Sequence, residues 1–89
     1  MERIEVYFSG HVQGVGFRYR THQAASHFDV NGFVMNLADG RVRLVAEGTK
    51  SELDGLVAEI ENKMSGYMRG TDKQSLEATR EFQDFTIRR

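Results

Sequence analysis

The first third of the chain shows two different spacings of apolar positions. Between Arg3 and Phe8, apolar and polar residues alternate, which predicts a β-strand with one buried face. From Phe17 to Phe28 the apolar positions recur at the 3.6-residue period of an α-helix, and Asp29 to Gly32 reads as its exit. The helical face that we expect to be buried consists of Phe17, Thr21, Ala24, Ala25 and Phe28.

The middle of the chain predicts a hairpin followed by a second helix. Strand-like residues from Gly32 to Asn36 and from Arg41 to Glu47 flank a turn that closes with Asp-Gly. A helix is then expected from about Lys50 to Met64, and Thr49 with Glu52 matches a capping box, in which each side chain accepts a backbone N–H of the other residue. The apolar stripe of this helix is Leu53, Leu56, Val57, Ile60 and Met64.

The last quarter of the chain has a weaker pattern. We expect a loop from Ser65 to Lys73, then a strand from about Lys73 to Thr79 whose Leu76 and Ala78 point inward. A final strand, about Asp84 to Arg88, is expected to place Phe85 and Ile87 on the core face.

The order of these elements predicts the fold class. Two helices separated by a hairpin pack their apolar stripes on the same face of a sheet. The expected fold is therefore α+β, a ferredoxin-like two-layer α/β sandwich with two helices on one face of an antiparallel sheet. It has a βαββαβ core plus a C-terminal strand, and residues 1–89 are expected to form a single domain.

Composition narrows the class of protein. The chain has 89 residues, a net charge of −1 with acidic and basic residues intermixed, and no cysteine. The mixed charge argues against nucleic-acid binding, and no apolar run is long enough to cross a membrane. The absence of cysteine excludes disulfides and thiolate chemistry and fits a reducing compartment. We expect a cytoplasmic monomer that binds no nucleic acid and no membrane.

The candidate chemistry lies where the first strand meets the first helix. Gly10, Gly14 and Gly16 fall in seven residues, and such a junction can turn successive backbone N–H groups inward to bind an anion. The helix that follows adds the positive end of its dipole, and Arg18 stands in its first turn. These residues suggest a phosphate-binding loop closed by an arginine. The alternative is a glycine-rich connection with a solvated arginine, since glycine-rich loops are weakly specific.

Two stretches together resemble a known family. Gly10-His11-Val12-Gln13-Gly14-Val15-Gly16-Phe17-Arg18 is similar to the first acylphosphatase signature at every fixed position. Gly32-Phe33-Val34-Met35-Asn36, with Gly40, Val42 and Gly48, is similar to the second signature at its usual spacing. The resemblance is strong from Ile4 to about Met64. It departs from the family at residues 65–71, where members often carry Gly-Pro.

The resemblance implies a small enzyme that hydrolyses the carboxyl–phosphate anhydride of acyl phosphates without a metal or cofactor. In the family, the arginine of the first signature binds the phosphoryl group and the asparagine of the second holds the attacking water. These roles would fall on Arg18 and Asn36. The substrate phosphate-binding loop would comprise Val12, Gln13, Gly14, Val15, Gly16, Phe17 and Arg18. The side chain of Gln13 is expected to brace this loop, and His11 to be a solvated loop residue.

Two other functions stay open. A ferredoxin-like module could bind an anion or carbamoyl phosphate without turnover and act with a partner protein. An RNA-binding sheet is the third hypothesis, because Gly32-Phe33-Val34 faintly resembles the aromatic sheet motif of such domains. A water-orienting asparagine has no use in a pure anion binder, which favours the enzyme.

Overall fold

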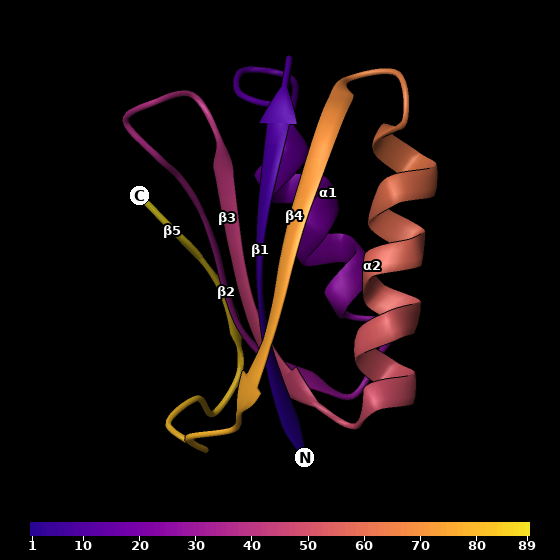
Figure 1. The fold of residues 1–89 in the computed structure, drawn as a ribbon, viewed down its shortest axis with the longest axis vertical. Coiled ribbons are helices and arrows are strands. Elements are labelled where there is room, and N and C mark those ends of the chain that lie inside the picture. Colours follow the sequence, from indigo (N-terminus) through magenta and orange to yellow (C-terminus); the bar gives the residue numbers. More distant parts are fainter.

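The computed structural model describes residues 1–89 as one five-stranded sheet with two helices on one of its faces (Figure 1). The strand order is β4-β1-β3-β2-β5. Neither helix is long and apolar enough to cross a membrane. The elements are β1 (Glu2–Gly10), α1 (Phe17–Ala25), β2 (Val30–Asn36), β3 (Val42–Gly48), α2 (Lys50–Met64), β4 (Met68–Glu77) and β5 (Phe85–Arg88).

The ferredoxin-like sandwich is confirmed, with one difference in the sheet. Strands β4, β1, β3 and β2 pair antiparallel, but β5 pairs parallel to β2, with Gly32 opposite Phe85 and Val34 opposite Ile87. The connection at residues 78–84 reverses the chain, so β5 runs opposite to β4. Strand β2 also runs opposite to β4, and β5 therefore joins the far edge of the sheet in the same direction as β2.

The core lies between the sheet and the helices, as the apolar pattern predicts. Ile4, Val6 and Phe8 of β1 are buried there together with the expected stripe of α2. Helix α1 buries the expected face but ends at Ala25, three residues before the predicted end at Phe28. The N–H groups of residues 26–28 bond to carbonyls three residues back, which tightens the chain out of the α-helix.

The predicted capping box forms only in part. The Thr49 hydroxyl accepts the backbone N–H of Glu52 at 3.4 Å. The Glu52 carboxylate accepts the backbone N–H of Asp29 at 2.9 Å, instead of closing back onto Thr49. Glu52 therefore ties the segment after α1 to the first turn of α2.

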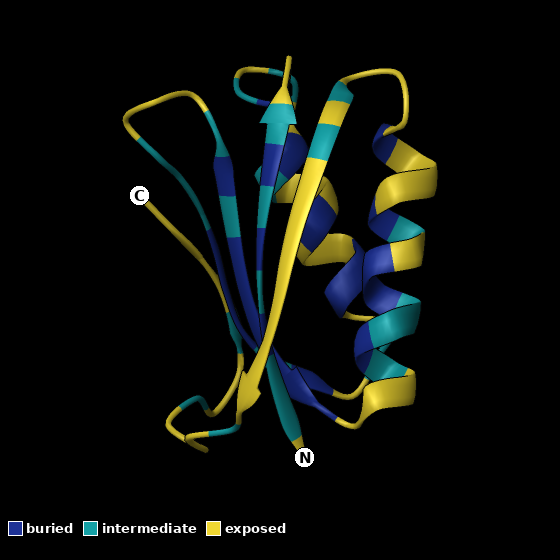
Figure 2. Cartoon of the chain, viewed as in Figure 1, coloured by how far each residue is buried: buried dark blue, intermediate teal, exposed yellow.

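Strand β4 is the largest departure from the sequence prediction. It begins at Met68, inside the expected loop, because it pairs along nearly the whole of β1. Its residues are mostly exposed on both faces (Figure 2). The prediction that Leu76 points inward is wrong: Leu76 pairs with Arg3, on the face away from the helices, and is 40% exposed. Ala78 lies beyond the strand and is half-buried.

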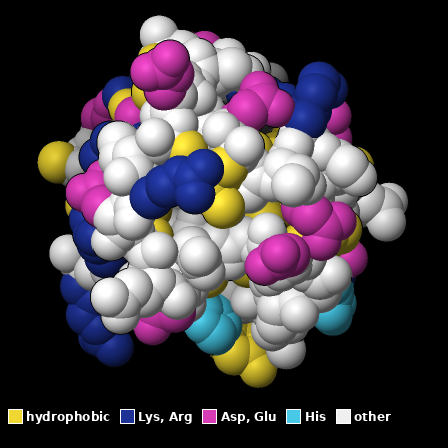
Figure 3. All heavy atoms as spheres, turned by 90° about the horizontal axis from the view of Figure 1, so that it is seen from below, with side chains coloured by type: hydrophobic (Ala, Val, Ile, Leu, Met, Phe, Trp, Pro, Cys, Tyr) yellow, Lys and Arg dark blue, Asp and Glu magenta, His cyan; other side chains and the backbone are white.

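The sheet face opposite the helices is covered by arginine and aromatic side chains. Phe33 is only 3% exposed, because Phe82 packs edge-on against its ring and the Arg88 guanidinium lies 3.8 Å from the ring centre. At the end of the molecule that carries the β4–β5 connection, acidic and basic side chains are interspersed (Figure 3). Phe33 is thus no free stacking platform, which removes the observation behind the RNA-binding hypothesis.

Candidate active site

The loop between β1 and α1 has unpaired backbone donors. Gly14 and Gly16 have φ values of 79° and 76°, which glycine adopts without the strain of a side chain. No backbone N–H from Val12 to Gly16 donates a hydrogen bond to an acceptor within the protein. A run of such donors beside left-handed glycines is the geometry of an anion-binding nest.

The start of α1 adds positive potential to this loop. Gly16 is the N-cap and supplies no side-chain acceptor, and the first turn contains no acidic residue. The N–H groups of this turn are therefore free, and the positive end of the helix dipole is uncompensated. Arg18 lies in the same turn, half-buried, and its Nη1 donates to the backbone oxygen of Arg88 at 3.2 Å.

Gln13 connects the loop to the β2–β3 hairpin, which confirms the bracing expected for it. Its Nε2 donates to the backbone oxygens of Leu37, at 2.8 Å, and Arg41, at 3.0 Å. The hairpin is itself fastened, because the Asp39 carboxylate accepts both the backbone N–H and the Nε of Arg41. These hydrogen bonds lower the pKa of Asp39. Loop and hairpin thus form one unit, with Asn36 directly before the hairpin turn.

Asn36 ends β2 on the helix-facing side of the sheet. It shares this face with Val34, since alternate residues of a strand point to the same side. Asn36 is half-buried, and its side-chain amide makes no hydrogen bond within the protein. The amide oxygen and nitrogen are both free for a ligand or a water molecule.

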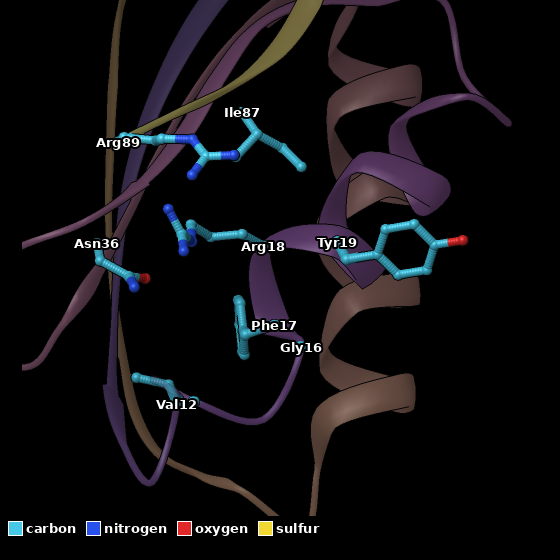
Figure 4. A pocket seen from close by; sticks show the side chains of 9 residues that line it. Val12, Gly16, Phe17, Arg18, Tyr19, Asn36, Ile87 and Arg89 are labelled. Atoms are coloured by element: carbon cyan, nitrogen blue, oxygen red, sulfur yellow. The ribbon is translucent and has the colours of Figure 1, made fainter.

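These parts surround a cleft of about 270 Å³. In Figure 4 the side chains of Arg18, Asn36 and Arg89 extend toward one another from α1, β2 and the residue after β5, while the Tyr19 ring points away. The lining contains no aspartate, glutamate or histidine. The residues that line the cleft are Val12, Gly14, Gly16, Phe17, Arg18, Tyr19, Asn36, Ile87 and Arg89.

The structure brings most of the candidate residues together. Of the seven loop residues, Gln13 turns to the hairpin and Val15 packs against the core, and the others line the cleft with Asn36. His11 lies outside it, beside Gly10 and Arg69 in a separate shallow depression.

Three residues that line the cleft are not predicted by the sequence pattern: Tyr19, Ile87 and Arg89. Ile87 and Arg89 reach the cleft only because β5 pairs parallel to β2, and no local pattern encodes that pairing. Ile87 lies on the helix-facing side of the sheet as expected, since it pairs with the buried Val34, but it is 39% exposed because it borders the cleft.

Comparison with known proteins places the chain in a family. The family model described as Acylphosphatase matches residues 4–87. An acylphosphatase of Paenarthrobacter aurescens (strain TC1) is 42% identical over 86 residues, which cover 96% of this chain and 92% of that protein. The crystal structure of acylphosphatase from Bacillus subtilis superimposes with a TM-score of 0.91 at 28% identity, with full coverage of both chains.

The same fold also occurs within a longer protein. HypF of T. kodakarensis superimposes with a TM-score of 0.85 at 22% identity, and the match covers 100% of this chain but 12% of that one. At this identity the likeness concerns the fold alone. The family match and the whole-length relative are decisive, and the chain belongs to the acylphosphatase family.

Proposed function

We propose that the acyl phosphate hydrolysis of this chain is carried out by the loop of residues 12–18 with Arg18, which hold the phosphoryl group, and by Asn36, which orients the attacking water. The observation that carries this division of roles is the cleft itself. It joins unpaired backbone donors, an arginine and an unpaired amide, and it contains no acidic side chain that would repel a phosphate.

The phosphoryl group fits the side of the cleft that the loop forms. Its oxygens can accept the free N–H groups of residues 12–16 and those of the first turn of α1. The Arg18 guanidinium adds a planar pair of donors, and its bond to the Arg88 carbonyl fixes its direction. These contacts strengthen as negative charge develops on the transferring oxygens, which is the condition for accelerating the reaction.

The attacking water is assigned to Asn36. Its amide does not titrate in water, so it orients the water and does not remove a proton. The water oxygen forms the new bond to phosphorus, and the carboxylate leaves with the electron pair of the broken P–O bond. The cleft has no histidine, aspartate or glutamate side chain to take the water proton, so we assign that proton to a phosphate oxygen of the substrate. The products are a carboxylate and inorganic phosphate.

We propose that this reaction needs no metal. An acyl phosphate is an activated anhydride with a good leaving group, so holding its charge and aligning a water are the main tasks of the site. The donor set of the cleft is cationic and amide-based, whereas magnesium and related ions are bound through carboxylates. No group of three or more histidine, aspartate or glutamate side chains is arranged so that it could hold a metal ion.

The test follows the loss of benzoyl phosphate in the presence of a chelator. Wild-type protein should hydrolyse it rapidly. Arg18→Ala should lower kcat/KM by a factor that corresponds to a loss of about 2–4 kcal/mol in transition-state binding, the cost of losing one oxyanion donor. Asn36→Ala should lower kcat with less effect on phosphate inhibition. The matched controls are Arg20→Ala and Asn62→Ala, which remove the same side chains at exposed helix positions outside the cleft.

The alternative function is an anion-binding or carbamoyl-phosphate-binding module that acts with a partner. The same experiment separates the two functions. Binding of phosphate that depends on Arg18, without turnover of benzoyl phosphate or carbamoyl phosphate, would favour the binding module. Activity that disappears with the chelator and returns with a divalent ion would contradict metal independence while leaving the hydrolase in place.

We further propose that the chain acts as a cytoplasmic monomer and binds neither nucleic acid nor membranes. The net charge of −1 and the interspersed surface charges support this proposal. The large exposed apolar side chains are single residues from different elements, which offer no extended surface for another chain. Light scattering of the protein as it elutes from a size-exclusion column should give the mass of one chain. These exposed residues are Met1, Tyr19, Tyr67, Leu76 and Ile87.

A further inference from the structure

The cleft contains a second arginine that neither the phosphate site nor the rest of the fold uses. Arg89 lines the cleft, is exposed, and its side chain makes no hydrogen bond or ion pair within the protein. Other arginines on the same sheet are occupied: Arg3 pairs with Glu81 at 2.7 Å and Arg43 with Glu5 at 3.0 Å. A free guanidinium in a cleft without acidic residues is available to a ligand.

The position of Arg89 is tied to that of Arg18. The backbone oxygen of Arg88 accepts the Arg18 guanidinium, and Arg89 is the next residue. The Arg88 side chain lies on the other face of the sheet, 3.8 Å from the centre of the Phe33 ring. Because alternate residues of an extended strand share a face, Ile87 and Arg89 are both directed to the helix side, where the cleft lies.

Arg89 also lies away from the loop that binds phosphate. In Figure 4 the Arg18 guanidinium lies between Val12 and Phe17 on one side and Arg89 on the other. A phosphoryl group held by the loop and Arg18 would leave the acyl part of the substrate to extend past Ile87. Ile87 is 39% exposed and offers an apolar contact, and Arg89 offers a cation beside it.

We propose that Arg89 is a specificity-determining residue that binds a carboxylate on the acyl group of the substrate. The preferred substrates are then acyl phosphates of dicarboxylic acids, with an apolar spacer against Ile87 and a free carboxylate against Arg89. A guanidinium binds a carboxylate through two parallel hydrogen bonds, so it recognises the group and not only its charge. This inference rests on the proposed hydrolysis and adds the substrate class to it.

The test uses rigid aromatic substrates that cannot react with their own second carboxylate. Hydrolysis of 3-carboxybenzoyl and 4-carboxybenzoyl phosphate is compared with that of the carbamoylbenzoyl phosphates, which carry a neutral amide of the same shape. The measured quantity is the ratio of kcat/KM for the carboxylate to that for the matching amide. This ratio, compared between variants, cancels intrinsic differences in leaving-group reactivity.

We expect the ratio for the carboxylate position that reaches Arg89 to fall about 3- to 10-fold in Arg89→Gln, the size of an exposed but directed charge pair. Arg89→Lys should recover part of the loss, because it restores the charge without the planar fork. Raising the salt concentration should reduce the ratio in the wild type and have little effect on it in Arg89→Gln. Lys63→Gln removes the same charge from α2 outside the cleft and should leave the ratio as in the wild type.

Three outcomes would overturn the inference. An equal loss for carboxylate and amide substrates in Arg89→Gln would show that Arg89 binds the phosphoryl group, and the proposed hydrolysis would stand. Values of kcat/KM that do not change for either substrate in Arg89→Gln would show that Arg89 contacts neither the acyl carboxylate nor the phosphoryl group. Failure of the wild type to hydrolyse benzoyl phosphate or any of these substrates would refute the proposed hydrolysis, and the inference would fall with it.

Discussion

The Gln13 amide group holds the loop of residues 12–16 in register with the hairpin turn that follows Asn36. Its two hydrogen bonds join backbone oxygens at Leu37 and Arg41, so one side chain links the two halves of the site. Neither carbonyl lies near Gln13 in sequence. The identity of Gln13 therefore indicates a polar contact, but only the fold identifies its partners.

This arrangement predicts an order among substitutions of Gln13. Gln13→Ala should destabilise the fold by about 1–3 kcal/mol, since two hydrogen bonds to partly buried carbonyls are lost while each carbonyl keeps one backbone donor, and should weaken inhibition by inorganic phosphate. Gln13→Glu should be less stable than Gln13→Ala at neutral pH, because a carboxylate would face two carbonyl oxygens. Urea unfolding and phosphate inhibition constants measure the two effects. Equal stability of the two variants at neutral pH would contradict the contact.

At the scale of elements, the buried carboxylate of Glu47 fastens the segment between β4 and β5. Glu47 is 2% exposed and accepts the backbone N–H groups of Thr79, at 2.7 Å, and Arg80, at 2.8 Å. It also accepts the Thr79 hydroxyl at 3.1 Å, and the Arg3 guanidinium lies 3.6 Å away. This connection carries the chain to β5, so Glu47 in β3 helps to place Ile87 and Arg89 at the cleft.

The same contacts predict an acid-sensitive stability. Burial raises the pKa of Glu47, but the hydrogen bonds from Thr79 and Arg80 and the charge of Arg3 outweigh it, so the pKa in the folded protein lies below the ordinary value of 4.5. The contribution of Glu47 to stability is therefore complete above about pH 4.5 and is lost as the pH falls through the lower, folded value.

Glu47→Gln tests this contribution. At pH 7 the variant should lose about 2–4 kcal/mol of unfolding free energy, because its amide NH2 would meet a backbone donor in a buried position. The difference from the wild type should shrink as the pH is lowered below 4.5 in a series of urea titrations. Glu81→Gln, an exposed partner of Arg3, serves as the control and should cost much less. Parallel pH profiles for Glu47→Gln and the wild type would contradict the role of this carboxylate.

The secondary-structure elements also differ in how well the sequence predicts them. Local periodicity identified both helix stripes and the alternation of β1, because each is a property of consecutive residues. Leu76 was assigned to the wrong face, since alternation in a polar edge strand does not say which face meets the helices. The start of β4 at Met68 depends on pairing with β1, about sixty residues earlier, and residues 65–73 carry no apolar pattern to reveal it.

For the whole molecule, the cleft is the meeting point of three segments that are distant in the chain. Arg18 and Asn36 could be named from the two signatures, because each signature is a continuous stretch. Arg89 could not, because it reaches the cleft only when β5 pairs parallel to β2 at the far edge of the sheet. The part of the cleft proposed to hold phosphate can thus be predicted from sequence, whereas the part proposed to bind the acyl group depends on tertiary pairing.

A site assembled in this way couples ligand binding to global stability. Phosphate should bind the folded chain and not the unfolded one, since the unfolded chain does not bring the loop, Arg18 and the β5 end together. At a phosphate concentration ten times its Kd, the folded state should gain about 1.4 kcal/mol, which corresponds to a rise in Tm of about 6–11 °C in a domain of this size. Thermal unfolding followed by circular dichroism measures the shift, with sodium chloride at equal ionic strength as the control.

Arg18→Ala should lose most of this rise, because the guanidinium that closes the phosphate site is absent, whereas Arg20→Ala should retain it. The comparison separates binding at the cleft from a general salt effect, which would raise Tm equally in all three proteins. A rise of equal size in Arg18→Ala would place the bound phosphate elsewhere on the molecule, with the basic depression at His11 and Arg69 as the next site to examine. If Arg20→Ala keeps the rise in Tm and Arg18→Ala loses it, the stabilisation depends on the Arg18 guanidinium, which the catalytic proposal also requires.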